Sequence, residues 1–280
     1  YTKALSIKPN YDTARAQKLH NQAQICDWNG IDLEKKDINK LGLVENFVIP
    51  FSLFSFTDNP KTNFLRAKLY SRTLFPNKCL MFTPNFQRKN KKIRIGYFSS
   101  DFSEHPVSYL LARVLEKHNR DQFEVYGYSI NGNSDDKMRK KLIKSFDFFI
   151  DVQHKSDKEV AFLAHQNQID IAVNLNGYTQ NSRTGIFAFR AAPVQINFLG
   201  YPGSMGADYI DYIIGDKVVI PNNSQNFFSE KIIYLPDTYI PTDNTRKISD
   251  KFITRKNQGL PQNGFVLCCF NNSYKITLCI

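Results

Sequence analysis

The residues best suited to chemistry lie where apolar runs typical of β-strands end. The first such run is followed by residues 99–106, in which His105 stands directly before a proline that can begin a helix. The positive end of a helix disfavours an imidazolium, and a neutral imidazole can accept a proton at pH 7. His105 is therefore a candidate proton acceptor, although a histidine that only caps a helix or fills a core explains the same position.

Two further strand ends carry groups that suit a sugar. After one run, an Asn-Gly pair predicts a tight turn, and the hydroxyls of Tyr178 and Thr179 follow it. After the next run, three glycines begin at Gly200 and let the backbone approach a ligand closely. An ordinary strand-to-helix turn and an ordinary glycine-rich loop remain the alternatives.

A fourth strand end lies close to the last residue of the sequence. It offers the amide of Asn272, the phenol of Tyr274 and the ammonium of Lys275. A lysine is a suitable point charge for a diphosphate, and a loop that leads into a helix adds N–H donors. A solvated loop is the alternative interpretation.

Several common kinds of site have no signature here. The sequence has no Asp-x-Asp element, no His/Cys cluster, no GxSxG turn and no GxGxxG loop. We therefore expect chemistry without a metal or other cofactor, and neither a serine hydrolase nor a nicotinamide enzyme.

The elements that must position these residues alternate between strands and helices. Apolar β runs that alternate with helical segments of 10–12 residues require a parallel sheet covered on both faces, which predicts an α/β, Rossmann-like domain. We predict strands at 93–98, 123–128, 148–152, 169–175, 194–199, 212–214 and 231–235, and helices at about 107–115, 136–145, 157–166 and 182–189.

The flanking regions are less regular, and they divide the chain into four parts. Residues 1–40 have helical spacing, and the sequence Ala-Leu-x-Ile-x-Pro is similar to the end of a tetratricopeptide repeat. Residues 41–92 are predicted to be an irregular connector, and 93–258 the Rossmann-like lobe. Residues 259–280 are predicted to begin a second domain with a buried strand at 265–270.

Composition excludes some classes of partner. The net charge of +11 suggests nucleic acid, but much of the excess lies in residues 88–94, a polar connector, and 137–144, the solvated face of a helix. The sequence contains no run of about 18 apolar residues, so it predicts no membrane span. Five cysteines without CxxC spacing favour reduced thiols and a cytoplasmic location. The start lacks an initiator Met, so we expect a fragment of a longer protein.

Together, these motifs resemble one known family. Residues 95–108 (IGYFSSDFSEHPVS), 170–179 (DIAVNLNGYT), 190–203 (RAAPVQINFLGYPG) and 268–276 (CCFNNSYKI) follow in family order. They are similar to the protein O-linked N-acetylglucosaminyltransferases of the SPINDLY type over roughly residues 90–276. Three positions depart from the family pattern, namely Asn174 for Asp, Ala191 for Pro and Ser204 for Thr.

The resemblance implies a GT-B fold, in which two Rossmann-like lobes face each other across the active site. It implies transfer of N-acetylglucosamine from UDP to Ser or Thr hydroxyls of protein acceptors, with inversion and without metal. His105 matches an active-site histidine, and Lys275 the lysine that stabilises the departing diphosphate. By the same resemblance, Asn272 is expected near the nucleotide and Tyr274 near the sugar, and His165 aligns with another family histidine near the cleft.

The same resemblance leaves the activity of this chain open. Most of the nucleotide-binding lobe of the family follows the last matched motif, so we expect the chain alone to be an incomplete enzyme. Transfer from another donor such as GDP-fucose, or a non-catalytic scaffold that keeps one lobe, are the alternatives.

Overall fold

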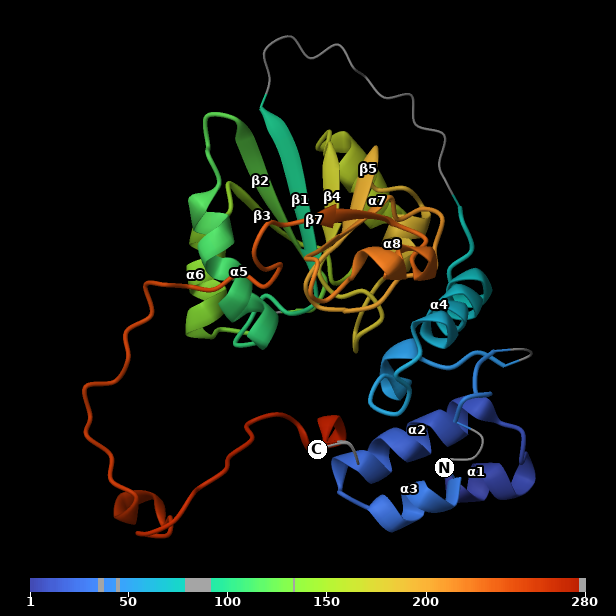
Figure 1. The fold of residues 1–280 in the computed structure, drawn as a ribbon. Coiled ribbons are helices and arrows are strands. Elements are labelled where there is room, and N and C mark those ends of the chain that lie inside the picture. The colour runs from blue at the N-terminus through green and yellow to red at the C-terminus, as the bar shows by residue number, and fades with distance from the viewer. Residues whose placement is uncertain (35–37, 44–45, 79–91, 133, 277–280) are drawn as a thin grey trace.

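A computed structural model describes residues 1–280 except 35–37, 44–45, 79–91, 133 and 277–280. The predicted basic connector 88–94 therefore lies mostly outside the described residues. A central parallel sheet dominates the rest, with helices on both faces and a separate group of helices at the N-terminus (Figure 1).

The sheet has seven strands in the order β3-β2-β1-β4-β5-β6-β7, all parallel. The predicted α/β, Rossmann-like lobe is thereby confirmed, because the order reverses between the neighbouring strands β1 and β4. The strands are β1 Ile93–Ser99, β2 Phe123–Ser129, β3 Phe148–Asp151, β4 Ile171–Asn174, β5 Val194–Asn197, β6 Tyr212–Gly215 and β7 Lys231–Tyr234.

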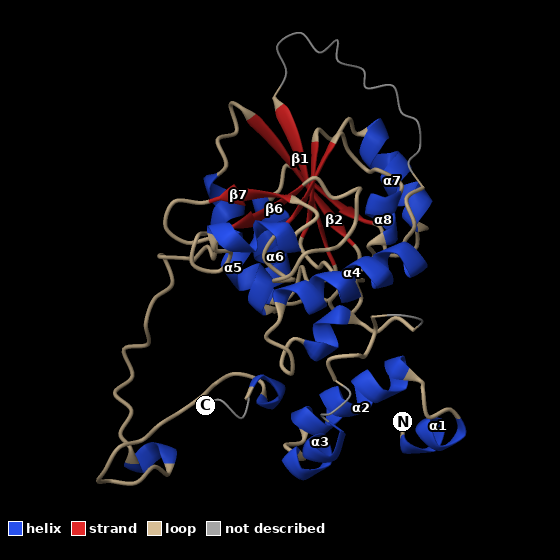
Figure 2. Ribbon diagram, turned by 45° about the vertical axis from the view of Figure 1, so that its right-hand side comes forward, coloured by secondary structure: helices blue, strands red, loops and turns tan. Residues whose placement is uncertain are grey.

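Helices pack on the sheet (Figure 2), and two apolar layers hold them there. On one face, Leu111 and Leu115 of α5 and Leu142 of α6 pack with residues of β1 and β2. On the other face, Val160 and Ala164 of α7 and Phe187 of α8 form the second layer. These helices are α5 Pro106–Lys117, α6 Lys137–Ser145, α7 Asp157–Gln166 and α8 Gly185–Ala188.

The N-terminal residues form a helical group with its own core. Leu19 and Ala23 are fully buried against Val48 and Leu53, as the helical spacing predicts. Its membership of a tetratricopeptide array stays a prediction. The helices here are α1 Thr2–Ile7, α2 Asp12–Gln24 and α3 Trp28–Glu34, followed by the short 3-10 helix η2 Pro50–Leu53.

The region predicted to be an irregular connector contains one long helix, α4 Pro60–Leu74. Asn59 caps it by accepting a hydrogen bond from the Thr62 N–H, and Pro60 fits its first turn. Arg66 of α4 is fully buried and donates to the carbonyls of Leu41 and Ile38, so it ties the preceding loop to the helix.

The strand predicted at residues 265–270 is not formed, and this prediction was wrong. The side chains of Phe265 and Phe270 are each 98% exposed, and Leu267 is 93% exposed. No described strand lies beside this segment, so its backbone has no ladder to join, and its apolar composition alone does not make a strand. The remaining short helices are η3 Asn222–Phe227, η4 Lys256–Gln258 and η5 Ser273–Lys275.

Within the described residues, no helix is both long enough and apolar enough to cross a bilayer. The basic helix α6 is partly neutralised by acids: Lys140 pairs with Asp135 at 2.9 Å, and Lys141 with Glu116 and Asp243 at 3.2 and 3.3 Å. Such ion pairs are typical of a helix face that is exposed to solvent.

Candidate active site at the switch point of the sheet

The candidate site lies at the carboxyl ends of β1 and β4, where the strand order reverses. Phe98 and Asn174 are partners in the parallel ladder, so the loops that follow both strands meet at this edge. In open parallel sheets, ligands bind in the crevice that such a reversal creates. The loop after β1 leads to His105, and the turn after β4 contains Thr179.

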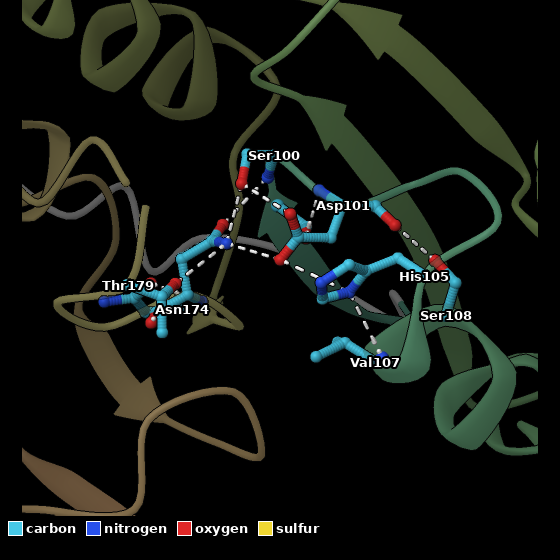
Figure 3. A network of polar contacts seen from close by, with 9 residues as sticks. Ser100, Asp101, His105, Val107, Ser108, Asn174 and Thr179 are labelled. Atoms are coloured by element: carbon cyan, nitrogen blue, oxygen red, sulfur yellow. Dashed lines mark hydrogen bonds and ion pairs between the residues drawn. The ribbon is translucent and has the colours of Figure 1, made fainter. Parts of the chain in front are cut away.

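Asn176 links the two loops, and Figure 3 shows the polar network around Ser100, Asp101 and His105. Its side-chain amide donates to Ser100 Oγ and to Asp101 Oδ2, each at 2.7 Å, and it accepts from the Ser100 N–H at 2.8 Å. Thr179 Oγ1 donates to the Asn176 carbonyl at 2.9 Å. Asp101 Oδ2 in turn lies 3.7 Å from His105 Nδ1, so one polar network runs from the turn after β4 to the predicted active-site histidine.

His105 is the N-terminal cap of α5, as its position before Pro106 predicts. Its backbone is extended, and its Nδ1 accepts a hydrogen bond from the Val107 N–H at 3.3 Å. Its side chain is 42% exposed, which leaves part of the ring accessible to a ligand. Capping and ligand binding are therefore compatible here, because capping uses only one of the two ring nitrogens.

The turn after β4 depends on two asparagines and a glycine. Asn174 Oδ1 accepts the N–H groups of Asn176 and Gly177, each at 3.1 Å. Gly177 has φ +58°, and a Cβ there would lie 2.2 Å from the Cβ of Tyr201, so glycine is required at this position. The Nδ2 of Asn174 is buried and has no hydrogen-bond partner among the residues that the structure describes.

Gly200 completes the edge from β5. A Cβ at this position would lie 1.9 Å from the Leu175 carbonyl oxygen and 3.5 Å from Asn176 Cα. The structure therefore brings His105, Thr179 and Gly200 to one edge of the sheet, beyond the strand ends, as we predict.

A cavity of about 220 Å³ lies beside this edge, between the loop after β5 and the segment that leads into α4. Its lining includes five aromatic residues, Phe54, Phe64, Tyr201, Phe227 and Phe228. Beneath it, Glu230 is 3% exposed and accepts hydrogen bonds from Ser204, Met205 and Ser229, yet its burial raises the pKa of its carboxyl.

His165 lies elsewhere, so the prediction that it lies near the cleft was wrong. It is in the last turn of α7, whose C-terminal end meets the start of β1, where Arg94 donates to the Asn167 carbonyl at 2.9 Å. This is the opposite end of the sheet from His105. His165 Nε2 donates to the Arg190 carbonyl at 2.6 Å, and burial lowers the pKa of the ring, which that hydrogen bond opposes.

The predicted diphosphate-binding group is also apart from His105. Tyr274 packs against His20 of α2, with ring centroids 4.8 Å apart, and Ser273 Oγ donates to the Gln24 carbonyl at 2.6 Å. Asn272 and Lys275 are exposed beside them. In Figure 1, this end of the chain lies next to α2, well away from the switch point. The structure therefore does not unite Lys275 with His105.

Sequence reasoning missed three members of the site, Ser100, Asp101 and Asn176. Their signal is positional, since each comes within two residues of the end of β1 or β4, where a parallel sheet exposes its ligand-binding edge. Within the described residues, no group of three or more His, Cys, Asp or Glu side chains is arranged to hold a metal ion.

Known proteins are similar to this chain over most of its length. Over 191 residues, the chain is 39% identical to a probable UDP-N-acetylglucosamine–peptide N-acetylglucosaminyltransferase, SEC, of Arabidopsis thaliana, covering 66% of this chain and 20% of that protein. It is 32% identical over 252 residues to the Caenorhabditis elegans UDP-N-acetylglucosamine–peptide N-acetylglucosaminyltransferase, covering 82% and 22%. The chain thus spans about a fifth of these relatives.

A solved structure agrees. A mutant O-GlcNAc transferase of Thermobaculum terrenum superposes with a TM-score of 0.67 at 26% identity, covering 86% of this chain and 47% of that one. The profile of glycosyl transferase family 41 matches residues 69–250, which include β1 to β7 and the whole switch-point network. The chain belongs to glycosyl transferase family 41.

Proposed function

We propose that this chain supplies the acceptor-side lobe of an enzyme that transfers N-acetylglucosamine from UDP to Ser or Thr hydroxyls of proteins. The observation that carries the proposal is the network that joins His105, Asp101 and Asn176 at the switch point. The relatives named as peptide N-acetylglucosaminyltransferases support the choice of donor and acceptor.

In this proposal, the ring of His105 faces the acceptor hydroxyl and the sugar, and Thr179 and the backbone at Gly200 form the adjoining wall. Lys275, Asn272 and Tyr274 act on the donor diphosphate and sugar. Since these three now lie beside α2, their role requires the 271–276 segment to leave that helix.

We further propose that the reaction needs no metal or other cofactor, that nucleic acid is not a partner, and that the protein works in the cytoplasm. The free thiols of Cys26, Cys268 and Cys269 fit a reducing compartment, and the acid-paired face of α6 fits a solvated surface.

The test is a fusion in which residues 93–276 replace the matching part of the Arabidopsis relative. We expect UDP release from UDP-N-acetylglucosamine that depends on a Ser/Thr peptide. His105→Ala and Lys275→Ala should each reduce turnover strongly, and loss of a positioned proton acceptor typically costs about 10²–10⁴-fold.

Two outcomes would contradict the proposal. A folded fusion that uses GDP-fucose in preference to UDP-N-acetylglucosamine would change the donor. A His105→Ala fusion that keeps near-normal turnover at saturating donor and acceptor would remove His105 from the reaction.

A further inference from the structure

His105 Nδ1 faces two groups that make opposite demands on it. The Val107 N–H lies 3.3 Å away and needs a lone pair on Nδ1. Asp101 Oδ2 lies 3.7 Å away and needs a proton on the same nitrogen (Figure 3). A neutral imidazole carries one proton, so satisfying one group leaves the other without its partner.

The Asp101 carboxylate is held firmly in this position. Asn176 Nδ2 donates to its Oδ2 at 2.7 Å, Ser100 Oγ donates to its Oδ1 at 2.9 Å, and its backbone N–H donates to Ser99 Oγ at 2.9 Å. Ser108 of α5 also donates to the Asp101 carbonyl oxygen. The loop that carries Asp101 is thereby fastened to the helix that His105 caps.

The two contacts differ in strength. The bond from Val107 is longer than the usual 2.9–3.0 Å or so for an N–H donor and an oxygen, and both of its partners are neutral. A bond from an imidazole N–H to a carboxylate is charge-assisted and about twice as strong as a neutral one. A lone pair on Nδ1 would face the Asp101 carboxylate, 3.7 Å away, and be repelled by it.

We propose that Asp101 is a positioning residue that holds the proton of the neutral His105 ring on Nδ1 and so presents an unprotonated Nε2 to the crevice. The inference rests on the proposed function for its consequence. The acceptor hydroxyl would give its proton to Nε2 while its oxygen bonds to the anomeric carbon. As this bond forms, the bond from the anomeric carbon to the diphosphate oxygen breaks, and its electron pair leaves with the diphosphate.

The first test needs no activity and uses the 280-residue chain. Labelling its five histidines with ¹⁵N and correlating the ring nitrogens with the ring protons identifies the tautomer of each, and His105→Gln assigns the signal of His105. In slightly alkaline buffer, we expect the Nδ1–H tautomer in the wild type. Asp101→Asn should shift it toward Nε2–H, because the Val107 N–H then has no competing charge.

Asp121→Asn is the matched control, since Asp121 is exposed and lies at the opposite end of the sheet, before β2. It should leave the His105 signal unchanged. A wild-type ring in the Nε2–H form, or the same tautomer in the wild type and Asp101→Asn, would overturn the proposal. The wild-type spectrum decides even if the Asp101 variant folds poorly.

The second test uses the fusion described above. Asp101→Asn should lower peptide-dependent UDP release at saturating substrates by about tenfold or more, less than the 10²–10⁴-fold of losing the proton acceptor itself. An unchanged rate would overturn the role of Asp101 in the reaction. If the fusion is inactive altogether, the proposed function fails, and the tautomer measurement still decides the positioning of His105.

Discussion

Gly200 sets the tightest packing constraint at the residue scale. We predict that Gly200→Ala destabilises the fold by about 1–3 kcal/mol, the usual cost of overpacking, because the new Cβ would meet the Leu175 carbonyl oxygen at 1.9 Å. Gly259→Ala is the control, since nothing lies within 4 Å of a Cβ there and only its φ of +66° opposes the change. The free energy of unfolding in urea measures both, and equal losses would show that Gly200 has room to move.

Glu230 should make stability depend on pH. Burial raises the pKa of its carboxyl in the folded protein, so its contribution is fully present below the unfolded pKa and is lost as pH rises through the folded pKa. In the Glu230→Gln variant, the side-chain amide oxygen can still accept a hydrogen bond from the Met205 N–H, and the side chain no longer titrates. We predict that the variant gains stability relative to the wild type as pH rises above the ordinary pKa of a glutamate, about 4.3.

Glu159 is the matched control for this measurement, with the opposite sign. Hydrogen bonds from Ser156 lower its pKa, so its contribution is present above the unfolded pKa and is lost as pH falls through the folded value. Glu159→Gln should therefore lose stability relative to the wild type as pH rises. Parallel pH profiles for the two variants would contradict the role of burial at Glu230.

Residue identity predicted some of the site and not the rest. His105 was found because Pro106 marks a helix start in the sequence itself. The role of Asn176 depends on the β1–β4 register, which places residues 76 positions apart within hydrogen-bonding distance. The local sequence pattern does not show this proximity in space, so it does not identify Asn176 as the residue that links the two loops.

At the scale of elements, the apolar pattern predicted all seven strands and the helices that cover them, because inner strands such as β1 and β2 are apolar on both faces and the covering helices turn apolar residues toward the sheet. It missed α4, whose start is marked by the Asn59 cap and Pro60 rather than by a strong apolar stripe. It also overpredicted residues 265–270, because strand formation needs a neighbouring strand as well as a suitable composition.

The exposed segment yields a prediction at this scale. Replacing Phe265, Leu267 and Phe270 together by Ser should leave the free energy of unfolding within about 0.5 kcal/mol of the wild type, as surface changes do. It should also reduce aggregation, measured by light scattering, since exposed apolar segments associate. Leu142→Ala in the buried core is the contrast, with an expected loss of about 2–5 kcal/mol. A comparable loss in the triple variant would mean that the segment is packed.

At the scale of the whole molecule, the two halves of the predicted site belong to different packed groups of residues. His105 belongs to the network at the edge of the sheet, whereas Tyr274 joins the apolar group of α2 and η2, together with Phe51 at 6.4 Å between ring centroids. Lys275 is exposed to water, where its attraction to a diphosphate is only about 1 kcal/mol at 4 Å. This arrangement therefore neither orients a sugar-nucleotide donor nor excludes water from the site.

We therefore predict that the 280-residue chain by itself does not turn over a sugar nucleotide. Titration calorimetry should detect no micromolar binding of UDP, and UDP release from UDP-N-acetylglucosamine should be the same with and without a Ser/Thr peptide. The fusion with the Arabidopsis relative is the positive control, because it adds the rest of that relative's chain, of which the matched part is 20%. Micromolar binding together with peptide-dependent release by the chain alone would mean that Lys275 reaches the site, or that another group in this lobe binds the diphosphate.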